Sequence, residues 1–336
     1  MTAASSNLPG LLTPSFAYKP FRYPWAHEFW KKQQQVHWMP EEVPLGEDLK
    51  DWAVKLNDKE RNLLTQIFRF FTQSDVEVQD NYMERYGRVF KPTEVKMMLA
   101  SFANMETIHI AAYALLLETI GMPETEFSAF MEYEAMKAKH DYMQTFGVDS
   151  NADICRTLAM FGGFTEGLQL FASFAMLMNF PRFNKMKGMG QIVSWSVRDE
   201  SLHCEGITKL FHTFVQERQC LTKSVREDII DCCQKTVRLE DAFIESENEV
   251  DSEINKECLL QYLAPNPNLL SEEKMLIYLY NKTYRQLLSY YDYLSMNCLF
   301  AFYPGNIYNF PAQVCFRIVS QLSFDKIMLE RFKAVL

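Results

Sequence analysis

Two Glu-x-x-His pairs constrain this chain more strongly than any other feature of its sequence. They are Glu106-Thr-Ile-His109 and Glu200-Ser-Leu-His203. Residues three apart lie on one face of a helix, so each pair directs a carboxylate and an imidazole to the same side. A carboxylate and an imidazole that point together from a helix form half of a metal site.

Each pair interrupts a stripe of residues at helical spacing that is otherwise largely apolar, as is typical of the face that a helix turns toward a core. The stripes are Leu99, Phe102, Glu106, His109, Tyr113 and Leu116 on one predicted helix, and Val193, Ser196, Glu200, His203, Ile207 and Leu210 on the other. Burying a carboxylate without a partner is costly, so these interruptions indicate a metal ion or an ion partner.

Two further carboxylates complete the pattern. Glu166 is the only acidic residue between positions 154 and 198, and it lies in the very apolar segment 161–174. Asp75 interrupts another apolar stripe. The nearby acidic residues Glu77 and Asp80 are alternative candidates for the same ligand position, but they do not lie on this stripe. The remaining members of that stripe are Phe68, Phe71, Val78 and Tyr82.

The candidate metal ligands are therefore four carboxylates and two imidazoles from four helices. They are Asp75, Glu106, His109, Glu166, Glu200 and His203. One carboxylate from each of two helices and a Glu-x-x-His pair from each of two others is the ligand pattern of ferritin-like di-iron and di-manganese bundles. Oxygen and nitrogen ligands suit iron or manganese, and the absence of a Cys ligand argues against a structural zinc.

The remaining sequence favours an all-α fold, a ferritin-like helical bundle with additional flanking helices, because strand-like alternation is absent. Capping boxes are expected at Asn57-Asp-Lys-Glu60 and Ser224-Val-Arg-Glu227. The predicted helices cover about residues 24–37, 57–86, 92–121, 124–146, 151–179, 185–216, 224–245, 271–299 and 312–334. We divide the chain into an N-terminal arm (1–20), a ferritin-like di-metal radical domain (21–245) and a divergent C-terminal helical region (246–336).

Charge and cysteine usage narrow the class of protein. The formal net charge of −9 disfavours nucleic acid and anionic membranes as partners. The eight cysteines contain no Cys-x-x-Cys spacing, which favours reduced thiols in a cytoplasmic protein. The N-terminus lacks the pattern of a secretory signal, and no apolar run of about 18 residues predicts a transmembrane helix.

The sequence resembles the radical-generating small subunit of class I ribonucleotide reductase. The matching stretches are Trp38-Met-Pro-Glu-Glu-Val43, Thr72-Gln-Ser-Asp75, Glu106 to Tyr113, Glu166 with the Phe-rich turn after it, and Arg198-Asp199-Glu200-Ser-Leu-His203. The resemblance implies a ribonucleoside-diphosphate reductase subunit in which a metal pair oxidises a nearby tyrosine to a stable radical. That radical would be used by a separate large subunit to reduce ribonucleotides to deoxyribonucleotides.

The same resemblance assigns roles to single residues. Tyr113, one helical turn after His109, matches the radical tyrosine. Trp38 matches the tryptophan that relays the electron, and Asp199 the carboxylate that would hydrogen-bond between Trp38 and a ligand histidine. The implied cofactor is two iron ions in a di-iron-oxo centre, with manganese as the alternative. The implied partners are the large subunit and a second copy of the chain in a homodimer.

Three alternatives stay open at this point. A ferroxidase or iron store of the ferritin-like class would share the ligands but would not need Tyr113, Trp38 or Asp199. A ferritin-like di-metal oxidase would need an open apolar pocket at the metals, and a purely structural bundle would not bury so many carboxylates.

After about residue 245 the resemblance weakens, so this lineage has remodelled its C-terminus or the reading frame has shifted there. Tyr303 and Tyr308 are candidate relays in that region.

Overall fold

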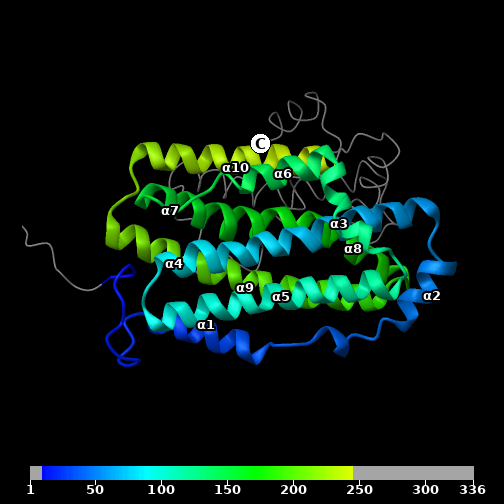
Figure 1. The fold of residues 1–336 in the computed structure, drawn as a ribbon, viewed down its shortest axis with the longest axis horizontal. Coiled ribbons are helices and arrows are strands. Elements are labelled where there is room, and N and C mark those ends of the chain that lie inside the picture. The colour runs from blue at the N-terminus through cyan, green and yellow to red at the C-terminus, as the bar shows by residue number, and fades with distance from the viewer. Residues whose placement is uncertain (1–9, 245–336) are drawn as a thin grey trace, which may run out of the picture.

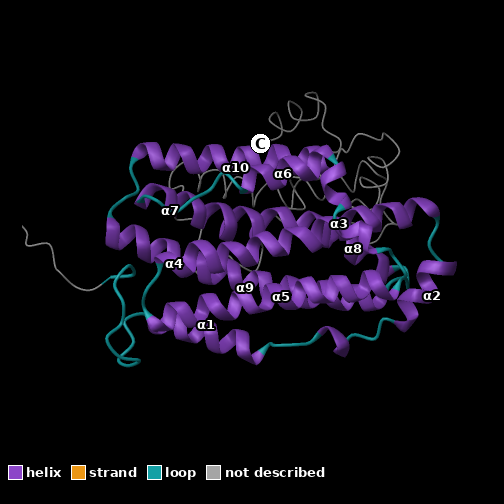
Figure 2. Cartoon of the chain, in the orientation of Figure 1, coloured by secondary structure: helices purple, strands orange, loops and turns teal. Residues whose placement is uncertain are grey.

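The computed structural model describes residues 10–244, and within that range every regular element is helical (Figure 1, Figure 2). The longer helices are α1 (Pro24–Gln35), α3 (Asp58–Asp80), α5 (Thr93–Thr119), α9 (Lys187–Arg218) and α10 (Lys223–Ile244), with α7 (Asn151–Leu158), η5 (Ala159–Gln169) and α8 (Leu170–Arg182) following one another without a break. The shorter elements are η1 (Pro40–Glu42), α2 (Gly46–Val54), η2 (Asn81–Tyr86), α4 (Gly87–Val89), η3 (Glu124–Phe127), η4 (Ala129–Glu132) and α6 (Glu134–Met143). The all-α prediction is thus confirmed for the described residues.

The long helices lie side by side with their axes in nearly one direction (Figure 1). Helix α5 packs against α1, α3 and α9, while α9 also packs against η5 and α8. Helix α10 covers η5, α6 and α7. Four segments, α3, α5, η5 and α9, therefore form the centre of the bundle. Among the described residues, no helix combines the length and the apolar character needed to cross a membrane.

Local hydrogen bonds fix where the central helices begin. The predicted capping box at Asn57 is confirmed, because the Asn57 side chain accepts from the Glu60 amide at 2.9 Å and Glu60 accepts from the Asn57 amide at 3.0 Å. Helix α9 is capped from α2, where Asp48 accepts from the amides of Gly188 (2.9 Å) and Met189 (2.6 Å). Carboxylates stabilise the free amides at a helix start.

One predicted helix start and one predicted helix stop were wrong. Helix α10 begins at Lys223 and is capped by Thr222, which accepts from the Val225 amide at 3.3 Å, so no capping box forms at Ser224. Helix α8 continues through Pro181 to Arg182. Proline has no backbone N–H, so one helical hydrogen bond is missing at Pro181, and the helix ends one residue later.

The continuous helix predicted for residues 124–146 was also wrong, because this segment forms η3, η4 and then α6. Arg69 on α3 hydrogen-bonds Glu126 at 2.5 Å and lies over the Tyr133 ring at 5.2 Å. Tyr133 precedes α6 in an extended conformation. These contacts with α3 outweigh the helical propensity of the segment.

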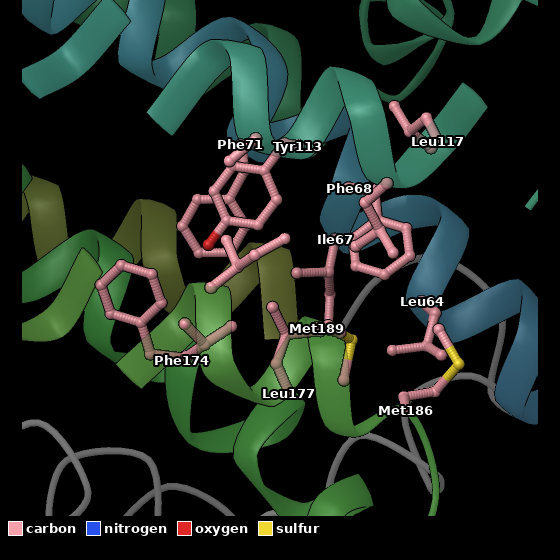
Figure 3. Close-up of a cluster of buried hydrophobic side chains, with 14 of the residues drawn as sticks. Leu64, Ile67, Phe68, Phe71, Tyr113, Leu117, Phe174, Leu177, Met186 and Met189 are labelled. Carbon is pink, nitrogen blue, oxygen red and sulfur yellow. The ribbon is translucent and has the colours of Figure 1, made fainter. Parts of the chain in front are cut away.

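The core consists of two clusters of buried side chains. One contains Phe71, Tyr113 and Phe174, and its packing is shown in Figure 3. The other contains Tyr82 and Phe102. Predictions for residues 1–9 and 245–336, including the helices at 271–299 and 312–334, lie outside the described residues, and the three-part division of the chain stays a prediction.

Candidate metal centre

The six candidate ligands come together at the centre of the bundle, and each is at most 1% exposed. Asp75 lies on α3, Glu106 and His109 on α5, Glu166 on η5, and Glu200 and His203 on α9. They form two groups whose ligand atoms lie within 4.8 Å of one another. One group contains Glu106, Glu166, Glu200 and His203. The other contains Asp75, Glu106 and His109.

Glu106 and Glu200 lie between the two histidines. The Nδ1 atom of His203 is 2.9 Å from Oε1 of Glu106 and 3.4 Å from Oε2 of Glu200. The Nδ1 atom of His109 is 3.5 Å from Oε2 of Glu106 and 3.2 Å from Oε1 of Glu200. Glu106 and Glu200 therefore each present a carboxylate oxygen to both histidines, while Asp75 groups with His109 and Glu166 groups with His203.

Among residues 10–244, many of these buried atoms have no hydrogen-bond partner. They are Oδ2 of Asp75, both carboxylate oxygens of Glu106, Nδ1 of His109, Oε2 of Glu166, Oε2 of Glu200 and both ring nitrogens of His203. Buried polar atoms are almost always satisfied in native proteins. A cluster of unsatisfied oxygen and nitrogen donors fits a pair of cations with this ligand preference.

Protons balance the charges of the group when no cation does so. Burial raises the pKa of the Asp75 and Glu166 carboxyls well above the usual range. Burial opposes the charged form of His203, but contacts with Glu106 and Glu200 raise its pKa to about 10. Burial also opposes the charged form of Glu106, whose pKa is nevertheless lowered by its contacts with both histidines. A cation that enters must displace some of these protons.

Asp199 contacts His109 on the Nε2 side of the ring, away from Glu106 and Glu200. The Nε2 atom of His109 lies 3.3 Å from Oδ2 of Asp199, and the indole N–H of Trp38 donates to the same oxygen at 2.8 Å. Burial would raise the pKa of Asp199, but the hydrogen bonds from His109 and Trp38 lower it overall. The other oxygen of Asp199 accepts from Arg198 at 3.2 Å. The contacts thus form one chain from Trp38 through Asp199 to His109.

Tyr113 is buried beside the group in a stack of aromatic rings. Its ring lies parallel to Phe71, with centroids 4.8 Å apart, and Phe71 stacks in turn on Phe174 at 4.9 Å (Figure 3). Burial, with a further contribution from the Asp75 carboxyl, raises the pKa of Tyr113. Tyr113 therefore keeps its proton at neutral pH.

The competitors of Asp75 are placed elsewhere. Glu77 is in contact with Nδ1 of His140 on α6, and Asp80 is exposed at the end of α3. The sequence did not anticipate Tyr82, whose hydroxyl donates to Oε1 of Glu166 at 2.6 Å. Its place on the stripe of Asp75 was the available signal.

Comparisons with known proteins agree with this arrangement. A family model for the small chain of ribonucleotide reductase matches residues 15–286. The chain is 44% identical over 247 residues to a probable ribonucleoside-diphosphate reductase small subunit of Invertebrate iridescent virus 6, covering 68% of this chain and 69% of that protein. It is 27% identical over 236 residues to the ribonucleoside-diphosphate reductase subunit beta of Chlamydia pneumoniae, covering 66% and 68%.

This chain belongs to the ribonucleotide reductase small-chain family.

Solved structures support the fold of the small chain. The ribonucleotide reductase R2 subunit from Clostridium botulinum aligns with a TM-score of 0.63 at 23% identity, covering 72% of this chain and 81% of that chain. A dimanganese(II)-NrdF structure from Streptococcus sanguinis aligns with a TM-score of 0.62 at 17% identity, covering 74% and 89%. The predicted ferritin-like fold and the predicted family are confirmed.

Membership makes the small chain a subunit of an oxidoreductase, ribonucleoside-diphosphate reductase. It also implies a large-subunit partner. The family match continues to residue 286, into the region 246–336 where we expected the resemblance to weaken.

Proposed function

We propose that the six buried ligands of the small chain hold two iron ions, with manganese as the alternative, and that Tyr113 is the side chain oxidised to a radical. The observation that carries this proposal is the cluster of buried, unsatisfied carboxylate and imidazole atoms beside a buried tyrosine. A dimanganese(II) relative of the same fold supports manganese as the alternative metal. When bound, the metal pair would supply the oxidising equivalent.

The surrounding residues prepare the site for one-electron chemistry. Asp199 accepts from the Nε2 side of His109, so the Nδ1 side faces Glu106 and Glu200. The stacked rings around Tyr113 exclude water and hold the phenol in one orientation. A radical formed there would be protected from solvent, which suits a stored oxidant.

We also propose that Trp38 passes electrons between this site and the large subunit. Support comes from the chain Trp38, Asp199 and His109, which joins a buried indole to a candidate ligand through two contacts of 2.8 Å and 3.3 Å. Such a route has no purpose in a ferroxidase or iron store. It therefore favours the reductase role over that alternative.

Two further proposals concern the state of the protein. We infer a homodimer, supported by exposed apolar side chains at Met39, Leu49 and Val54; a monomer at micromolar concentration in sedimentation would contradict it. We infer a cytoplasmic location, supported by the free thiols of the described cysteines at positions 155, 204, 220, 232 and 233.

The test of the proposed function uses the full chain with its cognate large subunit. Tyr113→Phe keeps the ring and removes the oxidisable hydroxyl, so it should bind as much metal as the parent but fail to support ribonucleotide reduction. Tyr86→Phe is the matched control, because Tyr86 is equally buried and donates to the carbonyl of Thr157 at 3.1 Å. Equal reduction by Tyr113→Phe and the parent would refute Tyr113 as the radical site, whereas a parent that supports no reduction would leave a di-metal oxidase or ferroxidase as the better account.

A further inference from the structure

A second buried tyrosine touches the metal-ligand group from the side opposite Tyr113. The Tyr82 hydroxyl donates to Oε1 of Glu166 at 2.6 Å, and both residues are at most 2% exposed. Oε2 of Glu166 has no hydrogen-bond partner among the described residues. A phenol is protonated at neutral pH, so it donates to one oxygen and leaves the other available to a cation.

Both partners of this hydrogen bond lie on π-helical turns. Tyr82 belongs to η2 (Asn81–Tyr86) and Glu166 to η5 (Ala159–Gln169). A π-turn widens the helix by one residue and redirects the side chains that follow, and such turns are frequent at functional sites. The backbone therefore departs from regular α-helix at both positions that this contact requires.

The packing of η5 against α9 explains why its backbone can approach so closely. A Cβ atom added to Gly162 would lie 2.3 Å from Cγ2 of Ile207 on α9. Glycine at this position lets η5 lie against the helix that carries Glu200 and His203. Glu166 is thereby brought to the ligand group at a place where Tyr82 can reach it.

Tyr82 shares a helical face with one ligand group and contacts the other. It follows Asp75 by seven residues, about two turns along the same helical run, which returns it to the same face. Asp75 belongs to the group with His109, whereas Glu166 belongs to the group with His203. The Tyr82 ring lies edge-on to His203, with centroids 6.0 Å apart.

We propose that Tyr82 is a positioning residue of the metal centre, which holds Glu166 in one orientation through its hydroxyl and so sets the affinity of the ion bound by Glu166, Glu200 and His203. This inference rests on the proposed metal centre. It gives the two tyrosines different tasks. Tyr113 is the proposed site of oxidation, whereas Tyr82 is hydrogen-bonded to a candidate ligand.

The test is a titration of the metal-free full chain with Mn²⁺, read by electron paramagnetic resonance of the free ion. The parent should bind two ions. Tyr82→Phe keeps the ring and removes the donor, so it should weaken one of the two sites by about 10- to 100-fold, the usual effect of losing a hydrogen bond to a metal ligand, and leave the other unchanged.

Tyr86→Phe is the matched control for a structural effect. Tyr86 lies on the same π-turn, with its ring 5.6 Å from that of Tyr82, but its hydroxyl donates to the Thr157 carbonyl. It should bind both ions as the parent does. In a Glu166→Ala background, Tyr82→Phe should cause no further loss of affinity, because the residue acts through Glu166.

The outcomes separate this inference from the proposed function. A parent that binds two ions and a Tyr82→Phe variant with the same two affinities would overturn the role of Tyr82 and leave the metal centre intact. Further weakening by Tyr82→Phe in the Glu166→Ala background would also overturn it. A parent that binds neither Mn²⁺ nor, in an anaerobic titration, Fe²⁺ would overturn both. If Tyr82→Phe does not fold, the metal-bound crystal structure of the parent decides, and a Tyr82 hydroxyl beyond hydrogen-bond distance of Glu166 refutes the inference.

Discussion

A buried ion pair near the aromatic stack of Tyr113 should make the fold sensitive to the loss of one of its two partners. The ammonium of Lys139 on α6 lies 2.7 Å from Oε2 of Glu240 on α10, and the side chains are only 1% and 5% exposed. The ammonium also lies 3.7 Å from the ring centroid of Phe70, whose ring is 5.7 Å from that of Phe71. The pair therefore packs against Phe70, whose neighbour Phe71 stacks on Tyr113.

Glu240→Gln keeps the shape of the side chain and removes its charge, so it leaves the ammonium buried without a counter-charge. Removing one partner of a buried pair destabilises a protein by about 3–5 kcal/mol. Burial lowers the pKa of Lys139, so the lysine can lose its proton and the effect should be near the lower value, about 3 kcal/mol. An unfolding entropy of about 2.1 cal/mol/K per residue gives about 1.4 °C per kcal/mol for a chain of 336 residues, so the unfolding temperature should fall by about 4 °C.

The assay is scanning calorimetry of the parent and three variants. Lys137→Met is the control, because the Lys137–Asp141 pair on the same helix has the same separation of 2.7 Å but is 50% and 55% exposed. Its loss should leave the unfolding temperature unchanged, since exposed pairs contribute little. The double variant Lys139→Met, Glu240→Met removes both charges and should be close to the parent. Equal effects of Glu240→Gln and Lys137→Met would refute the argument from burial.

The remaining predictions concern the metal centre and its relay. Chelated, metal-free protein should unfold at a lower temperature than the metal-bound protein, because buried carboxylates then lack a cation; equal calorimetric midpoints would count against the site. The folded-state pKa of His203, about 10, lies above its ordinary value of 6.5, so its contribution to the stability of the metal-free fold is complete below pH 6.5 and is lost as the pH rises through about 10. Urea denaturation across this range should reveal the decline, and a flat profile would contradict the assignment. Trp38→Phe and Asp199→Ala should both assemble the centre but slow electron delivery in stopped-flow reduction; rates equal to that of the parent would remove them from the route.

The sequence predicted those parts of the site that local geometry determines. Glu106 and His109 share a helical face because of their spacing, and the same holds for Glu200 and His203, so any helix at these positions would present them together. Asp75 and Glu166 could be selected because each interrupts an apolar segment. The structure brings the six candidate residues together, while Glu77 contacts His140 instead; their role as metal ligands stays a prediction.

Features that depend on distant contacts could not be predicted in this way. The hydrogen bond between Tyr82 and Glu166 joins residues 84 positions apart, and both lie on π-turns that no local pattern distinguishes from α-helix. The break within residues 124–146 depends on the reach of Arg69 from α3. In each case tertiary packing selects one of several backbone forms of similar local free energy.

The most direct test of the central proposal is electron paramagnetic resonance on the full chain after anaerobic loading with Fe²⁺ and exposure to O₂. The parent should give a tyrosyl radical signal. Tyr113→Phe should contain the same amount of metal and give no such signal, because only the oxidisable hydroxyl has been removed. A tyrosyl signal of equal intensity in the parent and in Tyr113→Phe would contradict the assignment of Tyr113 as the radical site.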